Sequence, residues 1–216
     1  MRTETTGGPT GPNPDETVAV FAEAATAAAK LVAGIGEDQW AGPGLGDWDL
    51  RALVGHTSRA LLTVEQYLAV PAPEPEVLRA ADYFLRVAAA PGADAQEVLA
   101  RGVAAGRALG ADPATAFSEI VERVIAAVTA AGTPVITCLV GAIRLSDYLP
   151  TRTFELVVHG IDIARATRQD PEIPGSALRQ AAALAVELAV TRGDGPRLLE
   201  ALTGRGALSP GYSVLN

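Results

Sequence analysis

Residues 151–166 constrain the fold of this chain more than any other stretch. Placed on a helix at about 100° per residue, four polar side chains fall within an arc of roughly 80° and form one stripe: Arg152, Glu155, His159 and Asp162. Nearly every other side of the helix is apolar, so we expect it to be largely buried among other helices. A buried charge needs a partner, and the stripe is therefore the first place to look for function.

Three side chains have the spacing of a metal site. Glu155 and His159 lie one turn apart, so both can converge on a single point. The only other histidine, His56, lies in a second helical segment, where Leu53 and Ala60 place it on the inward edge of the apolar stripe. Two imidazoles and one carboxylate with a free fourth position are typical of catalytic zinc. From spacing alone, a core histidine bonded to a carbonyl and a simple helical ion pair are equally good interpretations.

The other two residues of the stripe each allow two roles. Asp162 can accept the far N–H of a ligand imidazole and fix its tautomer, or it can form a salt bridge with an arginine, Arg165 or Arg152. Arg152 can pair with Glu155 in a structural ion pair, or it can hold an anionic substrate carboxylate through its guanidinium fork. We therefore treat both as ligand-supporting or substrate-binding candidates.

Composition favours a single all-α domain. With 216 residues and 49% hydrophobic content, the chain is long enough for one sizeable core. Alanine, the best helix former, is abundant in runs such as 21–31 and 181–190. We expect residues 1–14, rich in Gly, Pro and Thr, to be a disordered tail and residues 15–216 to form the helical domain.

Periodicity and capping residues divide that domain into segments. We expect helices over 15–32, 49–70, 76–90, 93–109, 113–130, 146–168, 176–191 and 196–202, three of them with the N-caps Asp49, Asp112 and Ser176. Residues 132–145 are enriched in β-branched side chains, which predicts a short strand or an extended crossover.

Two further side chains have both a structural and a functional interpretation. Trp48 can form a hydrophobic staple with Leu53 at a helix start, and a pocket wall is the alternative. Cys138, the single cysteine, is expected to be a small buried hydrophobe, and a redox thiol is the alternative.

Charge and hydropathy exclude several partners. The formal net charge of −8 disfavours nucleic-acid backbones and anionic membrane surfaces. No secretory signal and no uncharged apolar run of about 20 residues is present, so we expect a soluble, cytoplasmic protein.

Two motifs, residues 152–164 and residues 48–56, resemble the mycothiol-dependent maleylpyruvate isomerase family, which belongs to the DinB-like superfamily of metal-binding four-helix bundles. The resemblance implies an all-α DinB-like bundle with added short helices, and a divalent metal, usually zinc with nickel as an alternative, held by His56, Glu155 and His159. It also implies mycothiol as the thiol cosubstrate. A coordinated thiol is deprotonated, so no protein nucleophile is required.

The resemblance leaves the reaction open. Attack of the thiolate on a small electrophile leads either to cis–trans isomerisation or to S-transfer. Maleylpyruvate isomerase carries a further sterol-carrier-like domain that this sequence lacks, so we expect a thiol transferase or a specialised member of the family. A non-catalytic binding protein on the same scaffold is the alternative, as a monomer or a homodimer.

Overall fold

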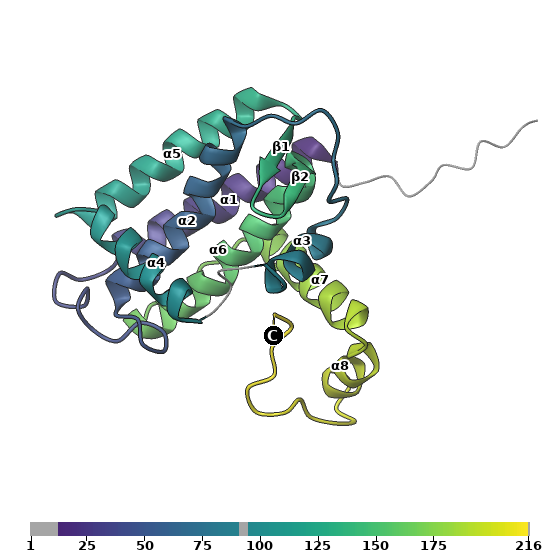
Figure 1. Ribbon diagram of the computed structural model, residues 1–216. Coiled ribbons are helices and arrows are strands. Elements are labelled where there is room, and N and C mark those ends of the chain that lie inside the picture. The colour runs from purple at the N-terminus through teal and green to yellow at the C-terminus, as the bar shows by residue number, and fades with distance from the viewer. Residues whose placement is uncertain (1–12, 91–94, 216) are drawn as a thin grey trace, which may run out of the picture.

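Four long helices form the centre of the molecule. The computed structural model describes residues 13–90 and 95–215, and in that part of the chain it contains eight helices and one two-stranded sheet. The bundle consists of α1 (Pro14–Ala33), α2 (Leu50–Leu68), α5 (Pro113–Ala131) and α6 (Leu145–Thr167). Helices α1 and α2 each pack against both α5 and α6 (Figure 1). Helices α2 and α6 are therefore in direct contact. The predicted all-α bundle is confirmed.

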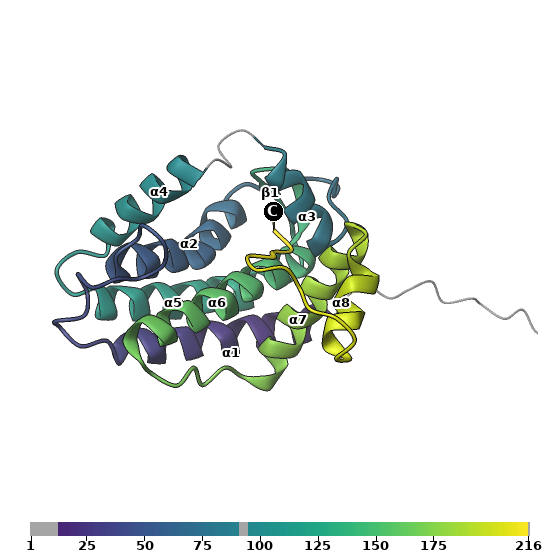
Figure 2. The same cartoon turned by 90° about the horizontal axis from the view of Figure 1, so that it is seen from below.

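Four shorter helices cover the outside of this bundle. Helix α4 (Ala95–Ala108) packs on α2, while α3 (Ala80–Ala88) and α7 (Gly175–Thr191) pack on α6. Helix α8 (Gly195–Leu202) packs on α7, and Figure 2 shows the segment after α8 running back toward α3. These elements form the walls around one side of the α2–α6 pair.

Capping follows the predicted residues in two of three cases. The Asp49 side chain accepts from the Ala52 amide at 2.7 Å, and the Asp112 side chain accepts from the Thr115 amide at 3.0 Å. The predicted Ser176 cap is wrong, because α7 begins one residue earlier, at Gly175. The Ser176 hydroxyl instead donates to Glu23 of α1.

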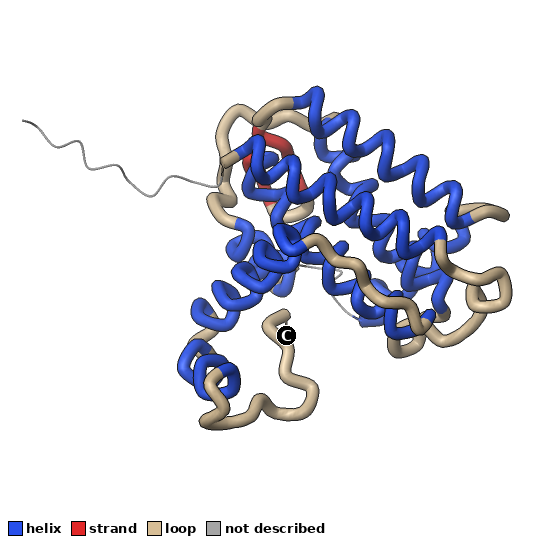
Figure 3. The backbone as a smooth tube through the Cα atoms, turned by 180° about the vertical axis from the view of Figure 1, so that it is seen from behind, coloured by secondary structure: helices blue, strands red, loops and turns tan. Residues whose placement is uncertain are grey.

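The β-branched stretch forms a hairpin at one end of the bundle (Figure 3). Strand β1 (Val135–Cys138) pairs antiparallel with β2 (Gly141–Arg144). The amides of Glu76 and Val77 donate to the Ala142 carbonyl at 2.8 and 2.9 Å. This pairing keeps Glu76 and Val77 out of a helix; α3 begins at Ala80, and the predicted helix start at residue 76 is wrong.

Helix α6 carries the polar stripe through the core. Its first ten residues, 145–154, are all buried, and Pro150 lies inside one continuous helix. The predicted tail falls largely on residues 1–12, which lie outside the described residues, and Pro14 already belongs to α1. None of the helices in the described ranges is long and apolar enough to cross a membrane.

Candidate metal centre

The three predicted ligands meet between α2 and α6. The two helices run antiparallel, because His56 lies opposite His159 and Thr63 lies opposite Tyr148, whose hydroxyl donates to Thr63 at 3.0 Å. One ligand atom from each of His56, Glu155 and His159 can be chosen so that all three lie within 4.8 Å of one another. The separations are of the size that a first-row divalent ion with bonds of about 2 Å can bridge after a small contraction.

His56 has one ring nitrogen that is buried and unpartnered among the described residues. Its Nδ1 is buried and has no hydrogen-bond partner in the described part of the chain. Burial, together with the positive charge of His159, lowers the pKa of His56 to about 4, so the imidazole is neutral at pH 7 and its lone pair is available. An orphaned, neutral imidazole nitrogen beside a carboxylate fits a metal ligand, since buried polar atoms are otherwise almost always satisfied.

His159 is held on both sides by carboxylates. Its Nε2 lies 3.2 Å from Glu155 Oε2, and its Nδ1 lies 3.3 Å from Asp162 Oδ2. Burial alone would lower the pKa of His159, but the hydrogen bonds to Asp162 and Glu155 outweigh it and raise the pKa to about 9. Without a metal, His159 is therefore the cationic partner of a charged cluster.

Glu155 is the anionic member of the cluster. Burial alone would raise the pKa of Glu155, but His159 and Arg152 outweigh that cost and lower it to about 2. Asp162 makes both contacts considered for it: one oxygen faces His159 Nδ1, and the other lies 3.9 Å from Arg165 Nη1. The same positions of Glu155 and His159 are compatible with an ion pair and with two ligands of one metal ion.

Trp48 forms one wall of the site. Its ring lies 4.5 Å from the His56 ring at an interplanar angle of 32°, and its Nε1 donates to the Leu99 carbonyl of α4 at 3.1 Å. Trp48 is 8% exposed and belongs to the hydrophobic core, and it also lines a large cavity. The pocket-wall interpretation is therefore supported, while the staple contact with Leu53 stays a prediction.

A large cavity opens on the candidate ligands. Its volume is about 610 Å³, within the range of small-molecule sites. Its walls come from α2, α3, α4, α6 and α7, from the hairpin turn and from the segment after α8, which contributes Val214 and Leu215. Sequence reasoning missed Arg59, Tyr83 and Phe84 as lining residues. Only Arg59, three residues after His56 on the same helix, carried a signal in the sequence.

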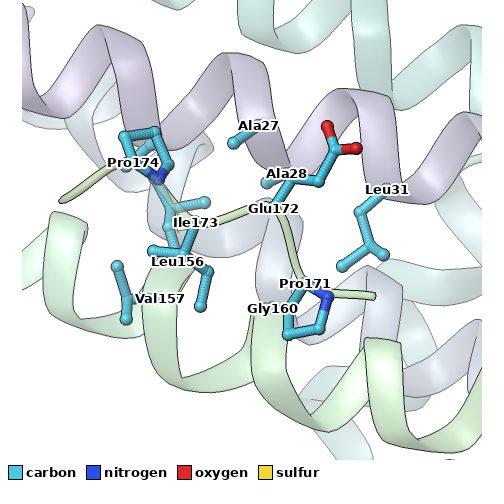
Figure 4. A pocket seen from close by; sticks show the side chains of 11 residues that line it. Ala27, Ala28, Leu31, Leu156, Val157, Gly160, Pro171, Glu172, Ile173 and Pro174 are labelled. Atoms are coloured by element: carbon cyan, nitrogen blue, oxygen red, sulfur yellow. The ribbon is translucent and has the colours of Figure 1, made fainter. Parts of the chain in front are cut away.

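A second, much smaller cavity lies between α1, α6 and residues 171–174 (Figure 4). It measures about 20 Å³, room for one water, and is lined by apolar residues of α1 and α6 and by Pro171–Pro174 residues, with Gly160 at its floor. No candidate ligand lines it, so the chemistry belongs to the larger cavity.

Cys138 is placed away from the ligands. Its thiol is buried and donates to the Gly141 carbonyl at 3.0 Å in the hairpin turn. Burial raises the pKa of the thiol, which is the opposite of what a nucleophile needs. The expectation of a small buried hydrophobe is confirmed.

Fold and site together define a class: a helical bundle with a candidate His, Glu, His metal centre between two antiparallel core helices. The family model described as the mycothiol maleylpyruvate isomerase N-terminal domain matches residues 21–164, which include all three candidate ligands. The chain belongs to this family, and the resemblance and the DinB-like bundle predicted from sequence are confirmed. No curated protein and no solved structure matches the chain.

Proposed function

We propose that the protein is a divalent-metal-dependent enzyme that uses mycothiol to attack a small electrophile, as an S-transferase or a cis–trans isomerase. The observation that carries this proposal is the meeting of His56, which has a buried nitrogen without a partner in the described ranges, with Glu155 and His159 in the wall of a large cavity. Membership of the mycothiol maleylpyruvate isomerase family supports the choice of thiol.

The donor set supports zinc, with nickel as the alternative. Two imidazole nitrogens and one carboxylate oxygen suit a borderline-soft ion, and three protein ligands leave a position for a small molecule. When bound, the ion supplies a Lewis acid on which a thiol loses its proton at neutral pH.

The protein's own residues would hold the ion and orient its ligands. Glu155 would contribute the one negative charge to the ion. Asp162 accepts a hydrogen bond from His159 Nδ1, which would leave the lone pair of Nε2 for the ion. The Trp48 ring packs against the His56 ring and limits its rotation. The buried Cys138 thiol is no nucleophile, which supports a thiol that arrives with the cosubstrate.

The two reactions share the first bond. The thiolate forms a C–S bond with an electrophilic carbon. In an isomerase, the former double bond rotates as a single bond, and loss of the thiolate returns the trans isomer. In a transferase, the carbanion formed by addition to an alkene takes up a proton, or a leaving group such as halide departs from the attacked carbon, and the S-conjugate is released as the product. The residues of the candidate site support both outcomes.

The test is thiol-dependent turnover by the metal-loaded protein. We expect consumption of conjugated alkenes or alkyl halides with mycothiol, none without thiol, and none with His56→Ala or His159→Ala. Absence of mycothiol-dependent turnover and of mycothiol binding over a broad panel of electrophiles would contradict the proposal and favour the alternative of a non-catalytic binding protein.

A further inference from the structure

The Arg152 guanidinium is a buried cation whose charge acts on nearby Glu155 but which has no carboxylate within ion-pair distance among the described residues. The residue is 7% exposed, and its Nε donates to the Thr151 hydroxyl at 2.9 Å. Its central carbon lies 5.1 Å from the Tyr83 ring centre and 4.9 Å from that of Tyr148. Among the described residues it forms no ion pair, and neither terminal nitrogen has a hydrogen-bond partner. Cation–π contacts offset only part of the cost of burying this charge.

The cavity in front of Arg152 is positive overall. Four arginines line it, Arg59, Arg101, Arg152 and Arg192, against two glutamates, Glu97 and Glu155. Of the four arginines, only Arg152 is buried. This local excess of positive charge, in a chain whose net charge is −8, favours entry of an anion.

The walls next to Arg152 are apolar. Tyr83, whose ring lies against the guanidinium, and its neighbour Phe84 line the cavity from α3, and Leu139 lines it from the hairpin turn. Arg152 precedes Glu155 by three residues, which corresponds to about 4.5 Å along the helix axis. A ligand that pairs with Arg152 therefore meets an apolar wall and lies about one turn from the candidate metal ligands.

We propose that Arg152 binds a carboxylate of the electrophilic substrate through its two free terminal nitrogens, while Tyr83 and Phe84 contact an aromatic or other apolar body on the same molecule. This inference rests on the proposed function, because it names the substrate class of that site. The guanidinium fork matches a carboxylate with two parallel hydrogen bonds. The substrate class is thus an apolar or aromatic carboxylate.

The test uses three unreactive probes and the metal-free protein, so that neither the ion nor a thiol contributes. Binding of 3-phenylpropanoate, 3-phenylpropanamide and propanoate is measured by titration calorimetry on the wild type, Arg152→Gln and the control Arg179→Gln, which changes an exposed arginine of α7 that does not line the cavity. We expect tightest binding of 3-phenylpropanoate to the wild type, weaker by about tenfold or more in Arg152→Gln, and little changed in Arg179→Gln.

Two results would overturn the inference. Equal affinity of the wild type for 3-phenylpropanoate and 3-phenylpropanamide would show that the site does not recognise the carboxylate, and this comparison does not depend on the folding of a variant. Equal affinity of the wild type for propanoate and 3-phenylpropanoate would show that the site does not contact the apolar body. Because the probes require no turnover, a failed thiol assay with successful probe binding contradicts the proposed reaction alone.

Discussion

At the scale of single residues, His56 and His159 are the same side chain in opposite surroundings. His56 packs beside Trp48 with an unpartnered nitrogen, and its pKa is lowered to about 4. His159 lies between Glu155 and Asp162, and its pKa is raised to about 9. The metal-free protein therefore holds one neutral and one charged imidazole at pH 7, and only the charged one must lose a proton to bind a metal.

Metal binding should therefore release about one proton per site between pH 5 and pH 9. In that window His56 and Glu155 are already deprotonated, since their pKa values are about 4 and about 2, whereas His159 is protonated. The apparent affinity should rise about tenfold per pH unit up to pH 9 and then level off. Calorimetry of zinc binding in buffers of different ionisation enthalpy measures the proton count. Binding without proton release at pH 7 would contradict a role for His159 as a ligand.

Asp162→Asn should weaken metal binding by about ten- to a hundredfold without unfolding the protein. The change removes the acceptor charge that faces His159 Nδ1 at 3.3 Å and fixes the ring. Arg165→Gln is the matched control, because Arg165 is 78% exposed on its side chain and lies 3.9 Å from the other Asp162 oxygen. Competition with a chromophoric chelator gives both affinities. An equal loss in the two variants would show that the ion pair, rather than the histidine contact, matters.

At the scale of elements, glycines set how closely α4 approaches α2. A Cβ on Gly55 would lie 2.0 Å from the Gly106 nitrogen, and a Cβ on Gly102 would lie 2.7 Å from the Trp48 ring. The two helices thus meet backbone to backbone, which holds Trp48 and α4 against the candidate metal centre. In α6, by contrast, a Cβ on Gly160 would have no atom within 4 Å.

These two glycines should respond to alanine in opposite directions. Gly55→Ala should lower the free energy of unfolding by about 1–3 kcal/mol or more, because the α2–α4 contact must open. Gly160→Ala should raise it by up to about 1 kcal/mol, because alanine is the better helix former and its methyl group enters the small cavity of Figure 4. Urea unfolding of both variants beside the wild type checks the signs. A stable Gly55→Ala protein would contradict the close crossing.

At the scale of the whole molecule, the sequence predicts what depends on helical period and leaves out what depends on tertiary contact. His56, Glu155 and His159 were predictable because each lies on the inward stripe of its own helix. The start of α3 was not, because Glu76 and Val77 pair with Ala142, a contact between residues far apart in the chain. The lining residues Tyr83, Phe84 and Val214 likewise come from elements that lie outside the bundle and that only folding brings to the cavity.

One divalent ion should be held by residues of α2 and α6 together. The measurement is elemental analysis by mass spectrometry of the purified wild type, His56→Ala and His159→Ala, each reconstituted and dialysed alike, with circular dichroism to verify that helicity is kept. We expect near one zinc or nickel per wild-type chain and little in either folded variant. Absence of metal from the wild type after reconstitution, or full retention by either variant, would contradict this expectation.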